Sequence, residues 1–360
     1  MGLHYKLLTD TPRLRQPRWR LARRLLALSA LVLLGWLPLV GTAGASSPNS
    51  TGNLGKVIIR TSGTTKGLRG VACPTSNACL AVGGSGTILA SGDGGHTWQT
   101  RKPVTSAPLV GIACPTSATC FAVGNASGGA GAPSTVLATS DSGRTWHKVS
   151  TITGFILQGI ACPTSSVCLA AAYYNGKWGG PILRSTDGGR TWRSTATNGG
   201  GFHAVTCMSN SACLAVGGGP TILASSDGGR TWRASLTDQP YGNGGFPFHS
   251  STLYGITCTS NTCVAVGDGG AIFASGDGGA TWANTVVYAS GGGLLLNAVA
   301  CPSARRCLAV AGYVLQSNDS GRTWPLIARF PGTPLFGITC ASSSDCIAVG
   351  GGGTIVQVQL

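Results

Sequence analysis

The chain has 360 residues, of which 57 are glycine, 14 are cysteine and 10% are charged, and its formal net charge is +15. It contains no glutamate, because all ten acidic residues are aspartates. This composition excludes chemistry that requires a glutamate side chain and leaves few carboxylates for acid–base catalysis.

The first 45 residues have the pattern of a signal peptide. Six arginines between positions 13 and 24 precede an apolar stretch at 25–37, and small residues at 43–45 form a cleavage site. The alternative is a retained membrane anchor, because the apolar span approaches bilayer length. We therefore expect a secreted, extracytoplasmic protein, or one anchored in the membrane through an uncleaved N-terminal segment and facing outside. Residues 46–54 are predicted to be a linker and 55–360 the folded domain.

Much of the positive charge lies in this N-terminal segment. Removing residues 1–45 leaves 18 basic and 9 acidic residues, a formal charge of +9. Several of the remaining arginines recur once per repeat and are spread around a rim rather than clustered. The charge is compatible with affinity for an anionic cell-wall polymer or membrane surface. Nucleic acid is not expected as a partner, because no stripe of aromatic and basic residues is present.

The rest of the chain is built from a repeated unit. One full unit contains four short β-branched runs, at 109–114, 120–124, 135–139 and 145–149, each bounded by turn residues. Such runs predict a four-stranded antiparallel meander. Four strands at a period of 40 to 50 residues are typical of a β-propeller blade.

The cysteines indicate how many blades there are. They fall into seven pairs with four or five intervening residues, and each pair flanks the first hairpin of a unit. Seven pairs predict seven blades, with a disulfide in each hairpin. Reduced structural thiols are the alternative, whereas zinc is not expected, because the pairs are spread around a ring. The predicted disulfides are Cys73–Cys79, Cys114–Cys120, Cys162–Cys168, Cys207–Cys213, Cys258–Cys263, Cys301–Cys307 and Cys340–Cys346.

A second marker, Asp-x-Gly-x-Thr-Trp with Ser or Thr two residues before the Asp, occurs six times. Its carboxylate can accept backbone N–H groups of the turn, its glycine permits a positive φ, and its tryptophan is expected to pack between blades. Six catalytic or metal-binding aspartates are rejected, since one carboxylate per blade places them too far apart to cooperate. The aspartates predicted to be structural are Asp93, Asp141, Asp187, Asp227, Asp277 and Asp319.

The last unit lacks this phrase and its fourth strand, whereas a strand at about 56–60 precedes the first unit. We predict that this N-terminal strand completes the last blade. The expected fold is thus all-β, a seven-bladed propeller of four-stranded antiparallel blades closed into a ring, which leaves no unpaired edge.

Few carboxylates remain for catalysis. Outside the repeated phrase and the N-terminal segment, only Asp238, Asp268 and Asp345 are left. Glycoside hydrolysis needs two carboxylates flanking one bond, and Asp238 with Asp268 is the only conceivable pair. His203 and His249 are predicted to lie in loops without a neighbouring nucleophile. No cofactor is implied, and an enzymatic role is disfavoured without being excluded.

One face of the propeller is predicted to vary between blades. The turns between second and third strands and the connections between blades lie opposite the uniform disulfide hairpins. Two of these loops are aromatic, and aromatic residues on loops over a rigid scaffold are typical of recognition. The alternative is that they cover apolar loop surface. The candidate binding residues are Tyr173, Tyr174, Lys177, Trp178, Tyr241, Phe246, Phe248 and His249.

The repeated phrase resembles the Asp-box, or BNR repeat, of sialidases and related propellers. The compact blades of this chain resemble more closely those of the seven-bladed photosystem II assembly and stability factors. Members of that group are non-enzymatic and bind protein partners. Sialidases also require a Tyr–Glu nucleophile pair, which a chain without glutamate cannot supply. The resemblance implies a non-enzymatic scaffold that binds a protein. We expect a monomer whose partner is a protein or a cell-surface glycan. The alternative is a sialidase-like or other glycoside hydrolase.

Overall fold

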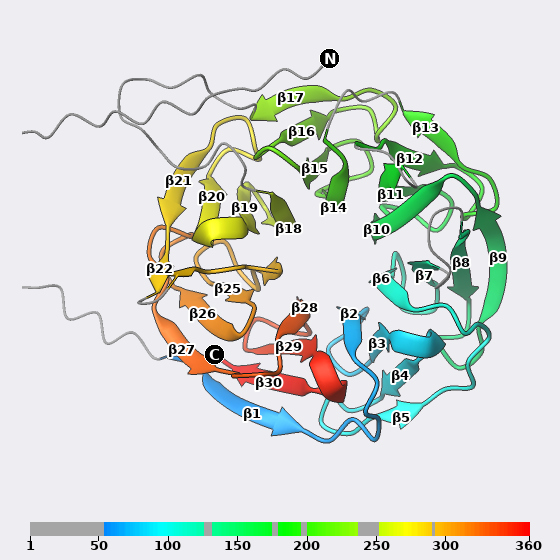
Figure 1. Ribbon diagram of the computed structural model, residues 1–360, viewed down its shortest axis with the longest axis horizontal. Coiled ribbons are helices and arrows are strands. Elements are labelled where there is room, and N and C mark those ends of the chain that lie inside the picture. The colour runs from blue at the N-terminus through cyan, green and yellow to red at the C-terminus, as the bar shows by residue number, and fades with distance from the viewer. Residues whose placement is uncertain (1–53, 126–131, 175–178, 196–199, 237–251, 290–291) are drawn as a thin grey trace, which may run out of the picture. The chain divides into compact units, whose positions relative to one another are not determined.

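The computed structural model describes residues 54–125, 132–174, 179–195, 200–236, 252–289 and 292–360. In these residues the chain forms seven four-stranded antiparallel sheets arranged as the blades of a ring (Figure 1). The predicted all-β propeller is confirmed. The predicted signal peptide lies outside the described residues. Among the described residues, no helix is long and apolar enough to span a membrane.

Each blade runs outward from the axis of the ring. The innermost strands are β2 (Leu68–Ala72), β6 (Leu109–Ala113), β10 (Phe155–Ala161), β14 (Phe202–Cys207), β18 (Leu253–Thr259), β24 (Ala298–Ala300) and β28 (Leu335–Cys340). The second strands are β3 (Cys79–Gly83), β7 (Cys120–Asn125), β11 (Cys168–Tyr174), β15 (Cys213–Gly217), β19 (Thr262–Gly267), β25 (Cys307–Val310) and β29 (Asp345–Gly350).

The outer half of each blade follows the same order. The third strands are β4 (Ile88–Ser91), β8 (Ser134–Thr139), β12 (Ile182–Ser185), β16 (Ile222–Ser225), β20 (Ala271–Ser275), β26 (Tyr313–Ser317) and β30 (Ile355–Gln359). The outermost strands are β5 (Gln99–Thr100), β9 (His147–Ile152), β13 (Arg193–Thr195), β17 (Arg233–Leu236), β21 (Ala283–Val286), β27 (Leu326–Arg329) and β1 (Lys56–Arg60). Short additions are the 3₁₀ turns η1 (Gly84–Gly86), η2 (Asp268–Gly270) and η3 (Gly351–Gly353), and a hairpin of β22 (Tyr288–Ala289) and β23 (Gly292–Gly293). We number the blades 1 to 7 from β2 to β28.

The N-terminal strand closes the ring as predicted. β1 pairs antiparallel with β30, the third strand of blade 7, and the two ends of the described chain lie side by side in Figure 1. Blade 7 has no Asp phrase, and a different polar contact joins its strands. Arg60 donates from Nε and Nη2 to Gln357 Oε1 at 2.8 and 2.6 Å, and Gln357 Nε2 donates to Asp345 Oδ1 at 3.1 Å. Because Gln357 is buried, these hydrogen bonds satisfy its amide.

Apolar clusters fill the interfaces between neighbouring blades. In one of them, Leu80 and Val82 of blade 1 meet Leu109 and Cys120 of blade 2, with Trp146 only 7% exposed. Six of the seven clusters contain the tryptophan of an Asp phrase, which confirms that these rings pack between blades. Each fully buried aliphatic side chain contributes about 1.5–3 kcal/mol, so these interfaces hold the ring together.

The seven predicted disulfides are confirmed. Each links the first and second strands of one blade, with Cα atoms 3.8–4.1 Å apart. No cysteine is left free in the described chain, which contains all fourteen.

The Asp phrase builds the turn before each of six outer strands. In blade 2, Thr139 Oγ1 donates to Asp141 Oδ1 at 2.7 Å, and Thr145 donates from its backbone N–H at 2.9 Å and from Oγ1 at 2.6 Å. The hydrogen bond from the Thr145 side chain, followed by that from its backbone, holds the pKa of Asp141 far below its usual range. Gly143 has φ of 80°, as the turn requires. The carboxylate is therefore occupied by its own turn.

Candidate functional site

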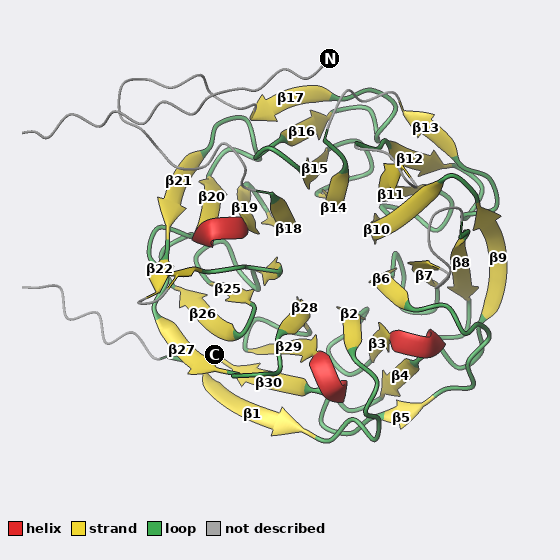
Figure 2. Cartoon of the chain, viewed as in Figure 1, coloured by secondary structure: helices red, strands yellow, loops and turns green. Residues whose placement is uncertain are grey.

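The order of strands gives the propeller two different faces. The hairpin face carries the seven disulfide hairpins and the six Asp turns. The variable face carries the turns between second and third strands and the connections between blades. Three of those turns form short 3₁₀ segments, drawn in red in Figure 2. The candidate binding residues are predicted to lie on this variable face.

Two of the eight predicted binding residues can be placed. Tyr173 and Tyr174 end β11 on the variable face of blade 3. Tyr174 is 41% exposed, and its ring lies 5.7 Å from the ring of Phe155. The other six lie outside the described residues and stay predictions, namely Lys177, Trp178, Tyr241, Phe246, Phe248 and His249.

A pocket that the sequence reasoning missed lies at the centre of the ring. Its volume is about 150 Å³, and each blade contributes one side chain to its wall. We call it the axial pocket. Its seven lining residues are Arg69, Val110, Gln158, His203, Tyr254, Asn297 and Phe336.

These seven residues occupy the same place in every repeat. Each follows a buried Leu or Phe and precedes a Gly or Ala at the start of the innermost strand. In six blades the pairing register shifts at this residue, as between Leu68 and Gly70. Such a bulge redirects the extra side chain, here toward the axis. The start of the strand lies at the variable face, so the pocket opens on that face.

The glycine after the bulge allows neighbouring innermost strands to approach. A Cβ added to Gly70 would lie 3.3 Å from the Cα of Gly111, and one added to Gly111 would lie 3.3 Å from the Cα of Gly159. At either position a Cβ would be a tight contact, and the neighbouring strand would have to move by a few tenths of an ångström. Small residues at this position, glycine in five blades and alanine in two, therefore allow the seven lining residues to share one pocket.

A hydrogen-bonded aromatic group forms one wall of the pocket. His203 lies between two tyrosine rings, with centroids 4.8 Å from Tyr173 and 4.6 Å from Tyr254, both edge-on. Its Nε2 is a hydrogen-bond partner of the Tyr173 hydroxyl, and the Tyr254 hydroxyl donates to Asp268 Oδ2 at 3.0 Å. The prediction that His203 lies in a loop is wrong, because it lies in β14. The preceding glycines, which read as a loop, end one residue before that strand begins.

Burial fixes the protonation of this wall. It lowers the pKa of His203 to about 4, so the imidazole is neutral at pH 7. Burial also raises the pKa of Tyr173, and burial together with the hydrogen bond to Asp268 raises that of Tyr254. Both phenols therefore remain protonated donors. The hydroxyl of Tyr254 is held toward the carboxylate of Asp268 by its hydrogen bond.

The opposite wall carries the charge of the pocket. The Arg69 guanidinium lies over the Phe336 ring, 5.1 Å from its centroid. Arg69 is the one residue with a permanent charge among the seven that line the pocket. Asn297 Nδ2 donates to the Leu335 carbonyl at 2.7 Å, which orients its amide.

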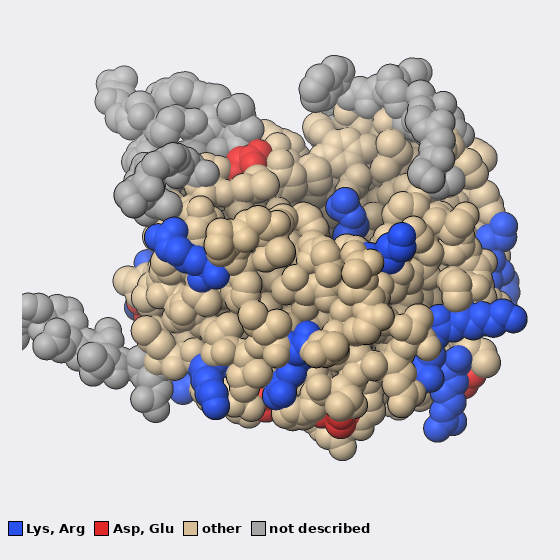
Figure 3. Space-filling view, turned by 60° about the horizontal axis from the view of Figure 1, so that its bottom comes forward, with Lys and Arg blue, Asp and Glu red and all other residues tan. Residues whose placement is uncertain are grey.

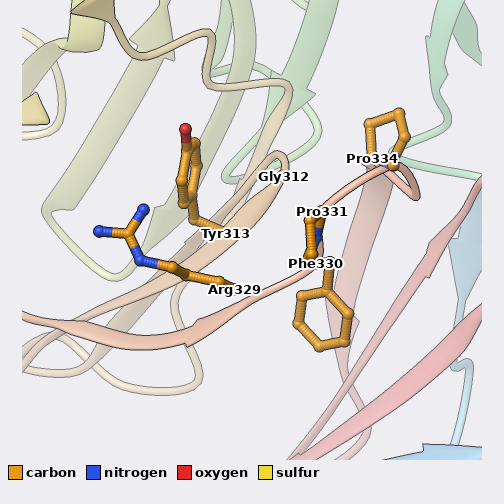
Figure 4. A pocket seen from close by; sticks show the side chains of 7 residues that line it. Gly312, Tyr313, Arg329, Phe330, Pro331 and Pro334 are labelled. Atoms are coloured by element: carbon orange, nitrogen blue, oxygen red, sulfur yellow. The ribbon is translucent and has the colours of Figure 1, made fainter. Parts of the chain in front are cut away.

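A second pocket lies at the edge of the variable face, between blades 6 and 7. It has a volume of about 340 Å³ and is lined by aromatic, proline and glycine residues and one arginine. The Arg329 guanidinium lies over the ring of Tyr313, 5.4 Å from its centroid, with Pro331 and Pro334 on the connecting loop (Figure 4). The sequence pattern did not single out these residues.

Of the predicted carboxylate pair, Asp238 and Asp268, only Asp268 lies among the described residues. Asp268, in η2, accepts the hydrogen bond from Tyr254, whereas Asp238 lies outside the described residues. In the part of the chain that is described, no three His, Cys, Asp or Glu side chains form a group that could hold a metal ion. Basic side chains are scattered over the surface in Figure 3, with few acidic ones between them.

Comparison with known proteins places the fold. No known protein family and no curated protein matches the sequence. Among solved structures, the chain is similar to YCF48 bound to D1 peptide, with 18% identity over 86% of this chain and 97% of the other and a TM-score of 0.64. It is also similar to YCF48 from Cyanidioschyzon merolae, with 16% identity over 84% and 98% of the two chains and a TM-score of 0.61.

A third similar structure is an enzyme. The GH74 enzyme of Niastella koreensis has 15% identity over 83% of this chain and a TM-score of 0.59, and the match covers 53% of the enzyme. Identities of 15–18% speak for the fold alone. The chain therefore shares its propeller fold with YCF48 and with part of a GH74 enzyme.

Proposed function

We propose that the chain is a non-enzymatic scaffold that binds a protein partner through its variable face, outside the cytoplasm. One observation carries this proposal. The blades repeat the same strands, disulfides and turns, yet the seven residues that meet in the axial pocket are all of different types. A uniform framework that presents one varied side chain per blade at a common point is suited to recognition.

Three further observations support the proposal. A solved structure of YCF48, which is similar in fold, holds a D1 peptide. The seven disulfides are typical of proteins that fold in an oxidising compartment, in agreement with the predicted signal peptide. The six Asp-phrase carboxylates are engaged in their own turns, which leaves them unsuited to catalysis.

Affinity capture with the full-length, disulfide-intact chain tests the proposal. Gln158→Ala in the axial pocket and Tyr174→Ala on the exposed end of β11 should each lower recovery of a crosslinked partner about tenfold or more. Trp178→Ala and Phe248→Ala test the two predicted aromatic loops in the same way. Arg233→Ala, exposed at the start of outer strand β17, is the matched control and should retain the partner. A partner retained by all the variable-face variants, or lost with Arg233→Ala, would refute the site.

The alternative is a carbohydrate-active enzyme, and the likeness to a GH74 enzyme gives it some support. Its candidate residues are Asp238 and Asp268, with Asp268 next to the axial pocket through Tyr254. Turnover on a panel of glycans that disappears in Asp238→Asn and Asp268→Asn would establish this alternative over the scaffold. A glycan bound without turnover would instead change the class of partner. We also propose that the chain is a monomer, which sedimentation velocity tests directly.

A further inference from the structure

The axial pocket has an ordered distribution of chemistry around its rim. The blades follow one another around the ring, so the position of each lining residue follows from its blade number (Figure 1). Arg69 lies in blade 1, with apolar Val110 and Phe336 in the two blades beside it. Gln158 and Asn297 follow, one on each side. His203 and Tyr254 lie opposite Arg69.

The guanidinium of Arg69 is placed to bind an anionic group of a ligand. The Arg69 side chain is exposed, and its guanidinium rests on Phe336, which limits the directions in which its N–H groups point. A planar guanidinium binds a carboxylate through two parallel hydrogen bonds. The one described carboxylate on the variable face, Asp268, lies on the opposite side and accepts the hydroxyl of Tyr254. Arg69 is therefore the counter-charge available to a ligand.

The size and sides of the pocket restrict that ligand further. A volume of about 150 Å³ is well below the roughly 300–1,000 Å³ of a pocket for a free small ligand. It suits a single residue better than a folded surface. Val110 and Phe336 flank the cation with apolar surface, and the amides of Gln158 and Asn297 supply donors and acceptors farther from it.

We propose that the axial pocket binds the carboxyl terminus of a partner polypeptide. The terminal carboxylate pairs with Arg69, the last side chain lies against Val110 or Phe336, and the last peptide group meets Gln158 or Asn297. An acidic sugar fits less well, because its ring presents hydroxyl groups where the pocket presents apolar side chains. This inference rests on the proposed binding function and specifies the part of the partner that is recognised.

Two synthetic peptide pools test it against the full-length, disulfide-intact chain. Both carry fluorescein on Gly-Gly-Ser followed by two randomised residues; one ends in a free carboxylate and the other in a carboxamide. Fluorescence anisotropy should show the free-acid pool binding about ten- to a hundredfold more tightly, the cost of losing hydrogen bonds to a charged group. Arg69→Gln should abolish this difference. Arg329→Gln should preserve it, although Arg329 also lies over an aromatic ring on the same face.

A second variant tests the same site without removing Arg69, so the test does not depend on the folding of Arg69→Gln. Val110→Asp places a carboxylate beside Arg69 and should weaken the binding of the free-acid pool while leaving the thermal unfolding midpoint close to that of the parent.

Equal affinity for both pools, no affinity for either, or a preference that survives Arg69→Gln would overturn the inference. Displacement of the peptides by millimolar glucuronate or N-acetylneuraminate, but not by N-acetyl-leucine, would reassign the pocket to an acidic sugar. A captured protein that still binds after C-terminal extension would leave the scaffold function standing and refute only this inference.

Discussion

His203 shows how one position in the repeat acquires its own chemistry. The same place in other blades holds Arg69, Val110 or Gln158, each at the start of an innermost strand. At His203 the neighbouring Tyr173 and Tyr254 rings exclude water, which removes the stabilisation that solvent gives to an imidazolium. The residue is thus a neutral hydrogen-bonding group and not a charged one.

The protonation of His203 gives a prediction with a defined sign. Its pKa is about 4 in the folded chain, below the ordinary value of 6.5, so folding favours the neutral ring. Its contribution to stability is present above about pH 6.5 and is lost as the pH falls toward 4. In NMR spectra of the folded chain, the ring signals of His203 should not titrate between pH 7.5 and 5.5. Titration of His203 with a midpoint above pH 6 would contradict the described burial.

The Asp turns make a second prediction at this scale. Burial alone would raise the pKa of Asp187, but hydrogen bonds from Thr191 and Ser185 lower it to about 2. The stability that these bonds contribute is therefore complete above about pH 4 and is lost as the pH falls to 2. Asp187→Ala should lower the free energy of unfolding at pH 7 by about 1–2 kcal/mol, measured by urea titration.

The pH dependence separates this effect from a general loss of packing. The difference between the parent and Asp187→Ala should shrink between pH 4 and 2. Asp187→Asn keeps the shape of the side chain without its charge, so it should lie between the two proteins and depend less on pH. An Asp187→Ala chain as stable as the parent at pH 7 would show that the turn does not need its carboxylate.

At the scale of elements, the strands could be predicted because each run is short and bounded by turn residues. In blade 2 the runs at 109–114, 120–124, 135–139 and 145–149 correspond to β6, β7, β8 and β9, with shifts at the ends. The disulfides could be predicted because the repeat restricts each cysteine to its own hairpin. Local patterns were sufficient for both.

The axial pocket could not be predicted in this way. Successive members are 39 to 51 positions apart in the sequence, and within a single repeat each is one residue among many. Only when the blades are arranged in a ring do Gln158, His203 and Tyr254 become neighbours. The aromatic loop pattern indicates Tyr173, whereas the glycines before its partner His203 obscure the start of β14 and predict a loop there. A comparison of equivalent positions across the repeats is the signal that could have found the pocket.

For the molecule as a whole, closure of the ring determines whether the pocket exists. The innermost strands touch at their glycines, and the clusters between blades hold them there. A ring that opens between blades 7 and 1 would separate Phe336 from Arg69. Binding at the axis therefore depends on β1, which lies at the outer edge of blade 7. Such dependence is a form of preorganisation, because the framework fixes the side chains before a ligand arrives.

Truncation tests this dependence. A chain lacking residues 1–60 loses β1 and leaves β30 as an open edge, whereas a chain lacking residues 1–54 keeps the pairing of Val57 with Val358. The longer truncation should lower the thermal midpoint by several degrees or more and promote aggregation, since an unpaired edge strand recruits other chains. It also removes the Arg60 bonds to Gln357, which is 1% exposed and would be left partly unsatisfied. Differential scanning calorimetry and light scattering of the two truncations measure the difference. If both unfold at the same temperature and remain monodisperse, β1 is dispensable, and the ring is held by contacts between blades alone.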